Sequence, residues 1–385
     1  MKILFVANTS FFLHNFLLGI MRRAQEEGYE VIAAAPSDDY TPKVEAQGFP
    51  IASLQCLDRK GSNPIRDFRF MRELLHLYNR ERPDLVFHFT IKPNVFGGIA
   101  ARLARVPSIP TVTGLGWLFT DRSAKAVLGS YGYKMLYRVA FKSCPRALFL
   151  NDDDRAFFVE QRLAPAQRAL VTPGSGVDTE RFAPTEHTGE HGTQKDFVFL
   201  LIGRLLWDKG IAEFVEAAAA VKKSHPDAQF QLLGPIDQEN RAAVAESMVR
   251  KWVEEGTVNY LGRTDDVRPY IAQSDVVVLP SYREGLPSAL LEAMSMARPV
   301  IASNVPGSRG LVEEGRTGFL VEARNPNDLA GRVIACIDMG KDGLRTMGKR
   351  AREKVLRQFD ARQASEAYLS VMNETLKGKS YARSG

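Results

Sequence analysis

The sequence predicts an α/β protein of two doubly wound domains, each built on a Rossmann-like parallel sheet, that face one cleft. Short, continuous apolar runs alternate with helical patterns, as expected for strands that are buried on both faces of a sheet. A length of 385 residues is enough for two domains that each bury a core. A polar stretch at 179–195 predicts a linker between a first domain, 1–178, and a second domain, 196–360.

The composition excludes several classes of protein. Hydrophobic residues make up 45% and charged residues 25% of the chain, which is typical of a globular protein. The net charge of +6 suits phosphorylated ligands or an anionic membrane surface, and no nucleic-acid-binding motif is present. Three widely spaced cysteines without metal-ligand spacing favour reduced thiols in the cytoplasm. We expect no transmembrane span and no cofactor.

The first domain opens with a strand at 2–7, a polar turn of Asn8, Thr9 and Ser10, and a helix at 11–28. The turn lacks the GxGxxG pattern, so a dinucleotide site of the usual kind is excluded. The other strands that we expect here are 30–35, 49–54, 84–89, 109–113 and 147–150, and the other helices are 64–82 and 95–105.

Polar side chains follow the strand at 84–89. His88, Lys92 and Asn94 fall near its carboxyl end, where doubly wound sheets bind their ligands. We therefore take these three residues as candidates for a ligand site of the first domain, with Lys92 as a phosphate ligand. The alternative for His88 is a purely structural role at the end of a strand.

The segment 122–146 carries six basic residues and no acidic residue. A basic amphipathic helix with interleaved aromatic residues is typical of binding to a membrane surface. The alternative is an ordinary helix that faces the core and has a solvated basic rim. The interleaved residues are Tyr131, Tyr133, Lys134, Leu136, Tyr137, Arg138, Phe141 and Lys142.

Residues 151–154 spell Asn-Asp-Asp-Asp, which resembles a metal-binding DxD motif. The run follows an expected strand and precedes a helical pattern. A helix N-cap by Asn151 or Asp152 explains it better, so we predict no metal site.

The second domain begins with a strand at 196–202, followed by Gly203 and Arg204 and then by Lys209 and Gly210. Two cations five positions apart on a turn into a helix form a clamp for a diphosphate, because Arg supplies a planar fork and Lys a point charge. The remaining strands that we expect are 228–234, 258–261, 275–279, 299–303 and 318–321. The remaining helices are 237–255, 288–297 and two that close the chain, the last within 361–385.

The stretch 280–299 reads as a loop, a helix and an exit turn behind an apolar strand. Glu284 lies in the loop, Gly285 and Leu286 follow, and Ser288 starts the helix that carries Glu292. Backbone N–H groups at a helix N-terminus suit an anion such as a diphosphate, and flanking carboxylates suit sugar hydroxyls. The alternative is a pair of solvated glutamates at the end of a helix.

The GRxxxxKG run and the Glu-x7-Glu pair together resemble the donor site of family 4 glycosyltransferases of the GT-B fold. The resemblance implies that Glu284 meets the donor sugar, that Glu292 meets the ribose, and that the turn at Arg263 brackets the base. It places Asn8, Thr9 and Ser10 near the donor phosphate, where many members carry glycines. Thr113 and Gly114 stand where members often carry a catalytic His, so none is assigned.

The sequences HFTIKPNVFGG and TVTGLG resemble a subgroup that acts on polyprenyl-diphosphate-linked sugars, including N-acetylgalactosaminyltransferases that extend diacetylbacillosamine-diphospho-undecaprenol. The resemblance implies a retaining, metal-independent transfer of a sugar, with N-acetylhexosamine as the best candidate, from a UDP-sugar. It also implies a last helix that packs on the first domain. His88, Lys92 and Asn94 are then candidates for the acceptor side. Arg59 and Lys60 join Lys92 as candidates for binding the diphosphate of the acceptor, at the cytoplasmic face of the membrane.

Two alternatives stay open. A UDP-sugar 2-epimerase on the same fold needs acid and base residues that the sequence does not place. A non-catalytic nucleotide-sugar-binding subunit is disfavoured because Arg204, Lys209, Glu284 and Glu292 are all present. No motif specifies an oligomeric state.

Overall fold

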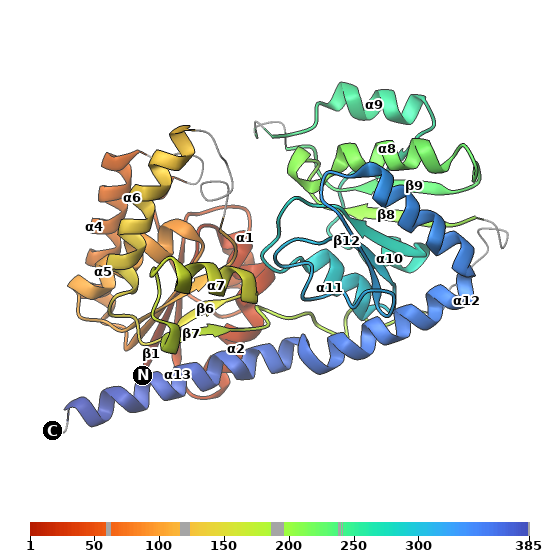
Figure 1. Ribbon diagram of the computed structural model, residues 1–385. Coiled ribbons are helices and arrows are strands. Elements are labelled where there is room, and N and C mark those ends of the chain that lie inside the picture. The colour runs from red at the N-terminus through yellow and green to blue at the C-terminus, as the bar shows by residue number, and fades with distance from the viewer. Residues whose placement is uncertain (59–62, 116–123, 186–195, 238–239, 241, 384–385) are drawn as a thin grey trace. The chain divides into compact units, whose positions relative to one another are not determined.

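The computed structural model describes residues 1–58, 63–115, 124–185, 196–237, 240 and 242–383, which form two compact units (Figure 1). The first unit holds residues 1–175 and 361–385, and the second holds residues 176–360. Each unit is built on a parallel sheet, and side chains that alternate along a strand enter separate core clusters. Ile3 and Phe5 belong to one cluster while Leu4 and Val6 belong to another, so both faces of the sheet are buried.

The first sheet has seven strands in the order β3-β2-β1-β4-β5-β6-β7, and all neighbouring pairs are parallel. Its strands are β1 (Lys2–Val6), β2 (Glu30–Ala35), β3 (Ile51–Ser53), β4 (Leu85–Phe89), β5 (Ser108–Val112), β6 (Ala147–Phe149) and β7 (Ala169–Val171). The strands β1, β2 and β4 are nearly fully buried. This explains why they read as continuous apolar runs in the sequence.

The helices of the first unit cover both faces of this sheet. They are α1 (Ser10–Phe12), α2 (Leu18–Glu26), α3 (Thr41–Glu45), α4 (Pro64–Glu81), α5 (Gly98–Leu103), α6 (Ala124–Phe141), α7 (Asp152–Glu160) and α13 (Ala361–Arg383), with the 3-10 turn η4 (Ala166–Arg168). Two of the expected helices contain a π-helical turn near their start, η1 (Leu13–Leu17) between α1 and α2 and η2 (Pro93–Gly97) before α5, close to the carboxyl ends of β1 and β4. Such turns are frequent at functional sites.

Helix α13 packs against α2 within the first unit. Tyr368, Leu369 and Met372 are buried in the same core cluster as the odd-numbered residues of β1. At the surface, the Arg23 guanidinium pairs with Glu366 at 2.5 Å. The last segment of the chain is therefore part of the first unit.

The second sheet has six parallel strands in the order β10-β9-β8-β11-β12-β13. Its strands are β8 (Val198–Ile202), β9 (Gln229–Leu233), β10 (Asn259–Tyr260), β11 (Val276–Leu279), β12 (Val300–Ser303) and β13 (Gly318–Val321). The chain moves outward from β8 to β9 on one side and returns to β11 on the other. The carboxyl ends of β8 and β11 therefore form the topological switch point of this sheet, where doubly wound folds bind ligands.

The helices of the second unit include one clear departure from expectation. They are η5 (Trp207–Lys209, a 3-10 turn), α8 (Ile211–Val221), α9 (Glu246–Glu254), α10 (Arg268–Gln273), α11 (Ser288–Ser295) and α12 (Pro326–Gln358), which is broken at Gly340. Among the described residues, the expected helix 237–255 begins only at Glu246, so its predicted start is wrong. The Ala242 carbonyl accepts the Trp207 N–H at 2.9 Å, and Ala243 forms an isolated antiparallel β-bridge with Leu206.

In the described part of the chain, no helix is both long and apolar enough to cross a membrane.

Candidate donor site

The turns after β8 and β11 lie side by side because these two strands are hydrogen-bonded neighbours. The first turn carries Gly203, Arg204 and Lys209, and the second carries Glu284, Gly285 and Leu286. Residues separated by about 80 positions in the sequence therefore meet at the switch point of the second sheet.

Lys209 and Glu284 form an ion pair across these two turns. The Lys209 Nζ donates to Glu284 Oε1 at 2.6 Å, and the two side chains are 23% and 11% exposed. The turn of Lys209 is held against the end of β11, because Gly210 has φ +72° and a Cβ atom there would lie 2.1 Å from the Pro280 carbonyl oxygen. Only glycine fits this contact, so Gly210 fixes where Lys209 stands.

Arg204 is the more exposed cation of the predicted clamp. Its guanidinium pairs with Asp237 at 3.3 Å, and its side chain is 55% exposed. The backbone before Arg204 packs closely on Gly234, which has φ +148°: a Cβ on Gly234 would lie 1.9 Å from the Gly203 carbonyl oxygen. The Arg204 side chain can exchange a weak surface ion pair for an anionic ligand at small energetic cost.

The second turn leads into α11, whose N-cap is Pro287 and whose first residue is Ser288. The first N–H groups of a helix have no partner within the helix, and they give this end a partial positive charge. The backbone of Glu284 and Gly285 packs tightly on Gly307, which has φ +83°. A Cβ at Gly307 would lie 2.6 Å from both of their carbonyl oxygens.

Tyr282 ties the two turns together. Its backbone N–H donates to the Asp208 carbonyl at 2.9 Å, and its hydroxyl donates to the Glu213 carboxylate at 2.8 Å. The guanidinium of Arg324, a residue with φ +63°, stacks 4.1 Å from the centre of the Tyr282 ring. Burial, followed by the Glu213 bond, raises the pKa of Tyr282 to about 12, so the hydroxyl keeps its proton.

Glu292 lies one turn into α11 and is partly buried. Burial raises the pKa of its carboxyl to about 7, and the nearby positive charge of Arg181 acts in the opposite direction. Glu292 is therefore a carboxyl group that changes its protonation near neutral pH. Arg263, by contrast, lies in the turn after β10, three strands away from β11, and pairs weakly with Asp265 at 3.8 Å.

The polar turn of the first unit uses its hydroxyls within the fold. Thr9 caps α1 by accepting the Phe12 N–H at 3.0 Å, and the Ser10 hydroxyl bonds to Thr41 at 2.9 Å and donates to the Pro36 carbonyl at 3.1 Å. Both side chains are buried, while Asn8 is partly exposed. A role for Asn8, Thr9 and Ser10 at a donor phosphate stays a prediction.

The acceptor-side candidates of β4 and η2 also have structural partners. His88 is fully buried, bonds to the Tyr78 hydroxyl at 2.7 Å, and has a pKa lowered to about 3 by burial. Lys92 donates to the buried Asp67 at 2.7 Å. Both functions of the Asn94 amide bond the backbone of Thr111, at 2.8 and 3.1 Å.

The Tyr78 hydrogen bond and the burial of His88 are consistent with the alternative that His88 has a purely structural role. The acceptor role of His88, Lys92 and Asn94 stays a prediction. Arg59 and Lys60 lie outside the described residues.

The run at 151–154 is a helix cap. Asn151 precedes α7, and its side-chain oxygen accepts the Asp154 N–H at 2.8 Å. In the described residues, no group of His, Cys, Asp and Glu side chains has the arrangement of a metal site.

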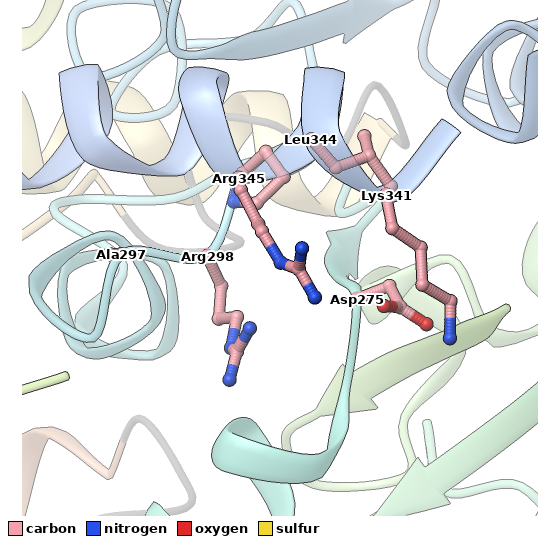
Figure 2. Close-up of a pocket in the computed structure, with 7 residues that line it drawn as sticks. Asp275, Ala297, Arg298, Lys341, Leu344 and Arg345 are labelled. Carbon is pink, nitrogen blue, oxygen red and sulfur yellow. The ribbon is translucent and has the colours of Figure 1, made fainter. Parts of the chain in front are cut away.

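A small cavity lies at the opposite edge of the second sheet, beside the residues that precede β11 and β12 (Figure 2). Arg298, Lys341 and Arg345 surround it together with Asp275. Its volume of about 10 Å³ is sufficient for one water molecule. The cavity is therefore separate from the switch-point site and too small for a nucleotide.

Sequence reasoning missed Tyr282, Glu213 and Gly307. Tyr282 stands in a loop without periodicity, Glu213 reads as one more acidic residue on a helix, and a glycine after a proline reads as an ordinary turn. Only the approach in space of helix α8 and the loops that follow β11 and β12 shows their roles.

Two doubly wound parallel sheets in one chain, one of them with a cation–carboxylate pair at its switch point, have the architecture of a GT-B glycosyltransferase. Two family models match the chain. Residues 2–149 match the family described as glycosyl transferase 4-like, and residues 196–339 match glycosyl transferases group 1.

Curated relatives cover most or all of the chain. The N,N'-diacetylbacillosaminyl-diphospho-undecaprenol alpha-1,3-N-acetylgalactosaminyltransferase of Campylobacter jejuni is 26% identical over 98% of this chain and 100% of its own length. The UDP-Gal:alpha-D-GlcNAc-diphosphoundecaprenol alpha-1,3-galactosyltransferase of Escherichia coli is 32% identical over 77% of this chain and 76% of its own.

Solved structures share the fold. Anabaena HepE in complex with UDP has a TM-score of 0.77 at 18% identity, with 97% of this chain and 100% of that chain covered. Sucrose-phosphate synthase of Thermosynechococcus elongatus has a TM-score of 0.79 at 17% identity, with 98% and 100% covered.

The chain therefore belongs to the group 1 glycosyltransferases, the family 4 enzymes of the GT-B fold. The predicted fold class and the predicted glycosyltransferase activity are confirmed. The relatives also confirm the resemblance to enzymes that act on undecaprenyl-diphosphate-linked sugars.

Proposed function

We propose that this enzyme transfers an N-acetylhexosamine, of the GalNAc or GlcNAc type, from a UDP-sugar to an undecaprenyl-diphosphate-linked sugar, with retention of the anomeric configuration. The observation that carries the proposal is the 2.6 Å pair of Lys209 and Glu284 at the switch point of the second sheet. Residues 196–360 bind the donor, residues 1–178 bind the acceptor, and 179–195 link them. Such enzymes take part in the assembly of surface glycans or of glycans for protein glycosylation.

The donor side has one group for each part of a nucleotide sugar. The leaving diphosphate gains negative charge as its bond to the sugar breaks, and Lys209, Arg204 and the N-terminus of α11 stabilise that charge. Glu284 accepts hydrogen bonds from hydroxyls of the sugar, and Glu292 accepts hydrogen bonds from hydroxyls of the ribose. Gly203, Gly285, Leu286 and Ser288 contribute backbone groups, and Arg263 lies beside the base.

Lys209 also neutralises Glu284 before the donor binds. While the site is empty it pairs with Glu284, and when the donor enters its ammonium reaches the phosphate and leaves a carboxylate oxygen to accept a sugar hydroxyl. The site therefore starts without an uncompensated charge in a partly buried position. The transfer needs no metal, because the cations of the protein neutralise the diphosphate.

The names of two relatives include a diphospho-undecaprenol acceptor, and we therefore propose an acceptor of the same class for this enzyme. An acceptor on a polyprenyl chain stays in the bilayer, so the enzyme works at the inner face of the cytoplasmic membrane. Arg59, Lys60 and Lys92 are the candidates on the first unit for binding the diphosphate of the acceptor.

The test is a mass-spectrometric screen. The enzyme is incubated with a panel of UDP-sugars, each with and without a short-chain polyprenyl-diphosphate N-acetylhexosamine acceptor. We expect one UDP-N-acetylhexosamine to add one sugar to the acceptor, and at most slow hydrolysis without it. Conversion of the donor to an epimer would support the 2-epimerase instead. UDP-sugar binding without any product would support a binding subunit.

A further inference from the structure

Two helices of the first unit present matching exposed stripes. On α4 the stripe is Ile65, Phe68, Arg69 and Arg72. On α6 it is Met135, Arg138 and Val139, followed by Lys142 in the turn directly after the helix. Both sets have the spacing i, i+3, i+4 and i+7, which places each set on one face of its helix. All eight side chains are exposed.

The apolar members of the two stripes are unusually open to solvent. Ile65 is 66% exposed, Phe68 55%, Met135 58% and Val139 41%. Leu103 on α5, which packs between α4 and α6, is 59% exposed. Single exposed hydrophobic side chains are normal on a protein surface, but a group of them on one layer of helices is a mark of an interaction site.

The two stripes look outward from the same side of the first sheet. The opposite faces of α4, α5 and α6 contribute Phe70, Ala100 and Tyr137 to one hydrophobic cluster. The three helices lie next to one another in the left part of Figure 1. The exposed faces therefore form one surface, which we call the α4–α6 surface: Ile65, Phe68, Arg69, Arg72, Leu103, Met135, Arg138, Val139 and Lys142.

The structure also revises which residues of α6 can reach a membrane. Tyr137 and Phe141 are 1% and 0% exposed and pack against Phe158 in the core. Lys134 donates to the Gln161 side chain at 2.9 Å and lies 5.7 Å from the centre of the Phe157 ring. Tyr137 and Phe141 therefore hold α6 in the fold. Among the side chains that the structure describes in this segment, the exposed apolar and cationic ones are Met135, Arg138, Val139 and Lys142, and the Arg138 guanidinium also donates to the Gln161 carbonyl at 3.2 Å.

We propose that the α4–α6 surface binds the anionic face of a lipid bilayer, with its apolar side chains inserted among the headgroups and its cations paired with lipid phosphates. The surface carries four cations and no acidic residue, and the whole chain has a net charge of +6. This charge complements an anionic bilayer, and the apolar members supply the contact that ions alone cannot. The inference deepens the proposed function, because it names the surface that brings the enzyme to a membrane-held acceptor.

The experiment measures binding to vesicles of phosphatidylglycerol and phosphatidylethanolamine across a salt series, with phosphatidylcholine vesicles as the neutral control. The variant Ile65→Ser/Phe68→Ser removes the apolar pair of α4, and we expect it to bind about tenfold more weakly at every salt concentration. The variant Arg69→Gln/Arg72→Gln removes two cations, and we expect about fivefold weaker binding per cation at low salt and little effect at high salt.

The matched control is Met248→Ser/Val253→Ser on α9 of the second unit, which removes two exposed apolar residues that are 38% and 41% exposed and lie outside the α4–α6 surface. It should bind vesicles as the parent does. Circular dichroism and thermal unfolding verify that each variant is folded. A water-soluble short-chain acceptor should be used equally well by all variants.

Equal vesicle binding by the parent and both α4 variants would overturn the inference, and so would equal binding to neutral and anionic vesicles. Self-association of the parent that the α4 variants abolish, without vesicle binding, would show that the surface takes a protein partner. None of these outcomes depends on the identity of the transferred sugar. If the proposed function were wrong, the parent enzyme would instead transfer no sugar to the soluble acceptor.

Discussion

Lys209 and Glu284 lie 75 positions apart in the sequence and make a 2.6 Å ion pair at the switch point of the second sheet. Each residue stands on a loop that a glycine holds in place, Gly210 for Lys209 and Gly307 for Glu284. A cation beside a carboxylate can serve a phosphate and a sugar hydroxyl on the same ligand. The predictions below test whether this pair and its surroundings form the donor site.

Lys209→Ala should slow transfer by about tenfold or more, because a charge-assisted contact contributes roughly 1.5 to 3 kcal/mol. The double variant Lys209→Ala/Glu284→Gln should lose less than the sum of the two single variants, since the two residues interact directly. Steady-state rates at limiting and saturating donor give both values. Lys251→Ala is the control, because Lys251 is an exposed lysine that pairs with Glu255 on α9. Unchanged rates for Lys209→Ala would remove Lys209 from the site.

Glu292 should make UDP binding depend on pH. Burial raises the pKa of Glu292 to about 7, so part of the unliganded enzyme carries a neutral carboxyl near neutrality. Ribose hydroxyls donate hydrogen bonds to the ionised carboxylate. UDP binding therefore releases the proton of Glu292, and the affinity for UDP increases as the pH rises from about 6 to about 8. Calorimetry in buffers of different ionisation enthalpy measures the proton release. Glu292→Gln should bind UDP more weakly and without this pH dependence. A hundredfold lower maximal rate of Glu292→Gln, with unchanged donor binding, would contradict a contact between Glu292 and the ribose.

The same carboxyl has a predictable effect on stability. The folded-state pKa lies above the value of about 4.5 for an unperturbed Glu, so the folded protein holds the proton more tightly than the unfolded chain does. The contribution of Glu292 to the free energy of unfolding therefore falls as the pH rises from about 4.5 through about 7. Glu292→Gln should raise the melting temperature relative to the parent at pH 8 and not at pH 4, which thermal unfolding measures directly.

Gly307→Ala should damage the donor turn without removing the fold. A Cβ at Gly307 would overlap the Glu284 and Gly285 carbonyl oxygens, and the residue has φ +83°, so the backbone of the turn must move. We expect UDP affinity to fall by about tenfold, which corresponds to roughly 1.4 kcal/mol of strain. Gly310→Ala is the control in the same loop, since a Cβ there meets no atom within 4 Å. Equal UDP affinity for the two variants would show that the loop is not part of the site.

Tyr282→Phe removes one hydrogen bond of a partly buried network and leaves the Glu213 carboxylate without the tyrosine hydroxyl. The free energy of unfolding should fall by about 1 to 3 kcal/mol. Transfer should slow even where the protein is fully folded, because Tyr282 links the Lys209 turn to the Glu284 turn. The double variant Tyr282→Phe/Glu213→Gln tests the link, and we expect it to recover part of the stability. Full activity of Tyr282→Phe would limit Tyr282 to a role in folding.

The strands and the turns that follow them were readable from the sequence, because strands buried on both faces must be continuously apolar and glycines mark the turns. The partners of the polar residues were not readable. Asp67 lies 25 positions before Lys92, and nothing in either segment indicates that the two form a largely buried ion pair. The inward orientation of Tyr137 and Phe141 was equally hidden, because a helix with cations on one side suits both a core and a membrane surface.

The stretch before α9 has a similar explanation. Its composition favours a helix, but residues 242 and 243 bond with Trp207 and Leu206, beyond the end of β8. A tertiary contact thus overrides a local preference. The same contact holds the loop that leads to Lys209, so the departure from the predicted helix contributes to the geometry of the candidate donor site.

We propose that Arg204 and Lys209 together bind the diphosphate of the donor. Titration calorimetry tests this most directly, by comparing the affinity of the enzyme for UDP with its affinity for UMP. The two ligands differ by the β-phosphate alone. We expect the parent to bind UDP at least about tenfold more tightly than UMP, and this preference to be largely lost in Arg204→Ala and in Lys209→Ala. Equal affinities of the parent for UDP and UMP, or a UDP preference that both variants retain in full, would contradict it.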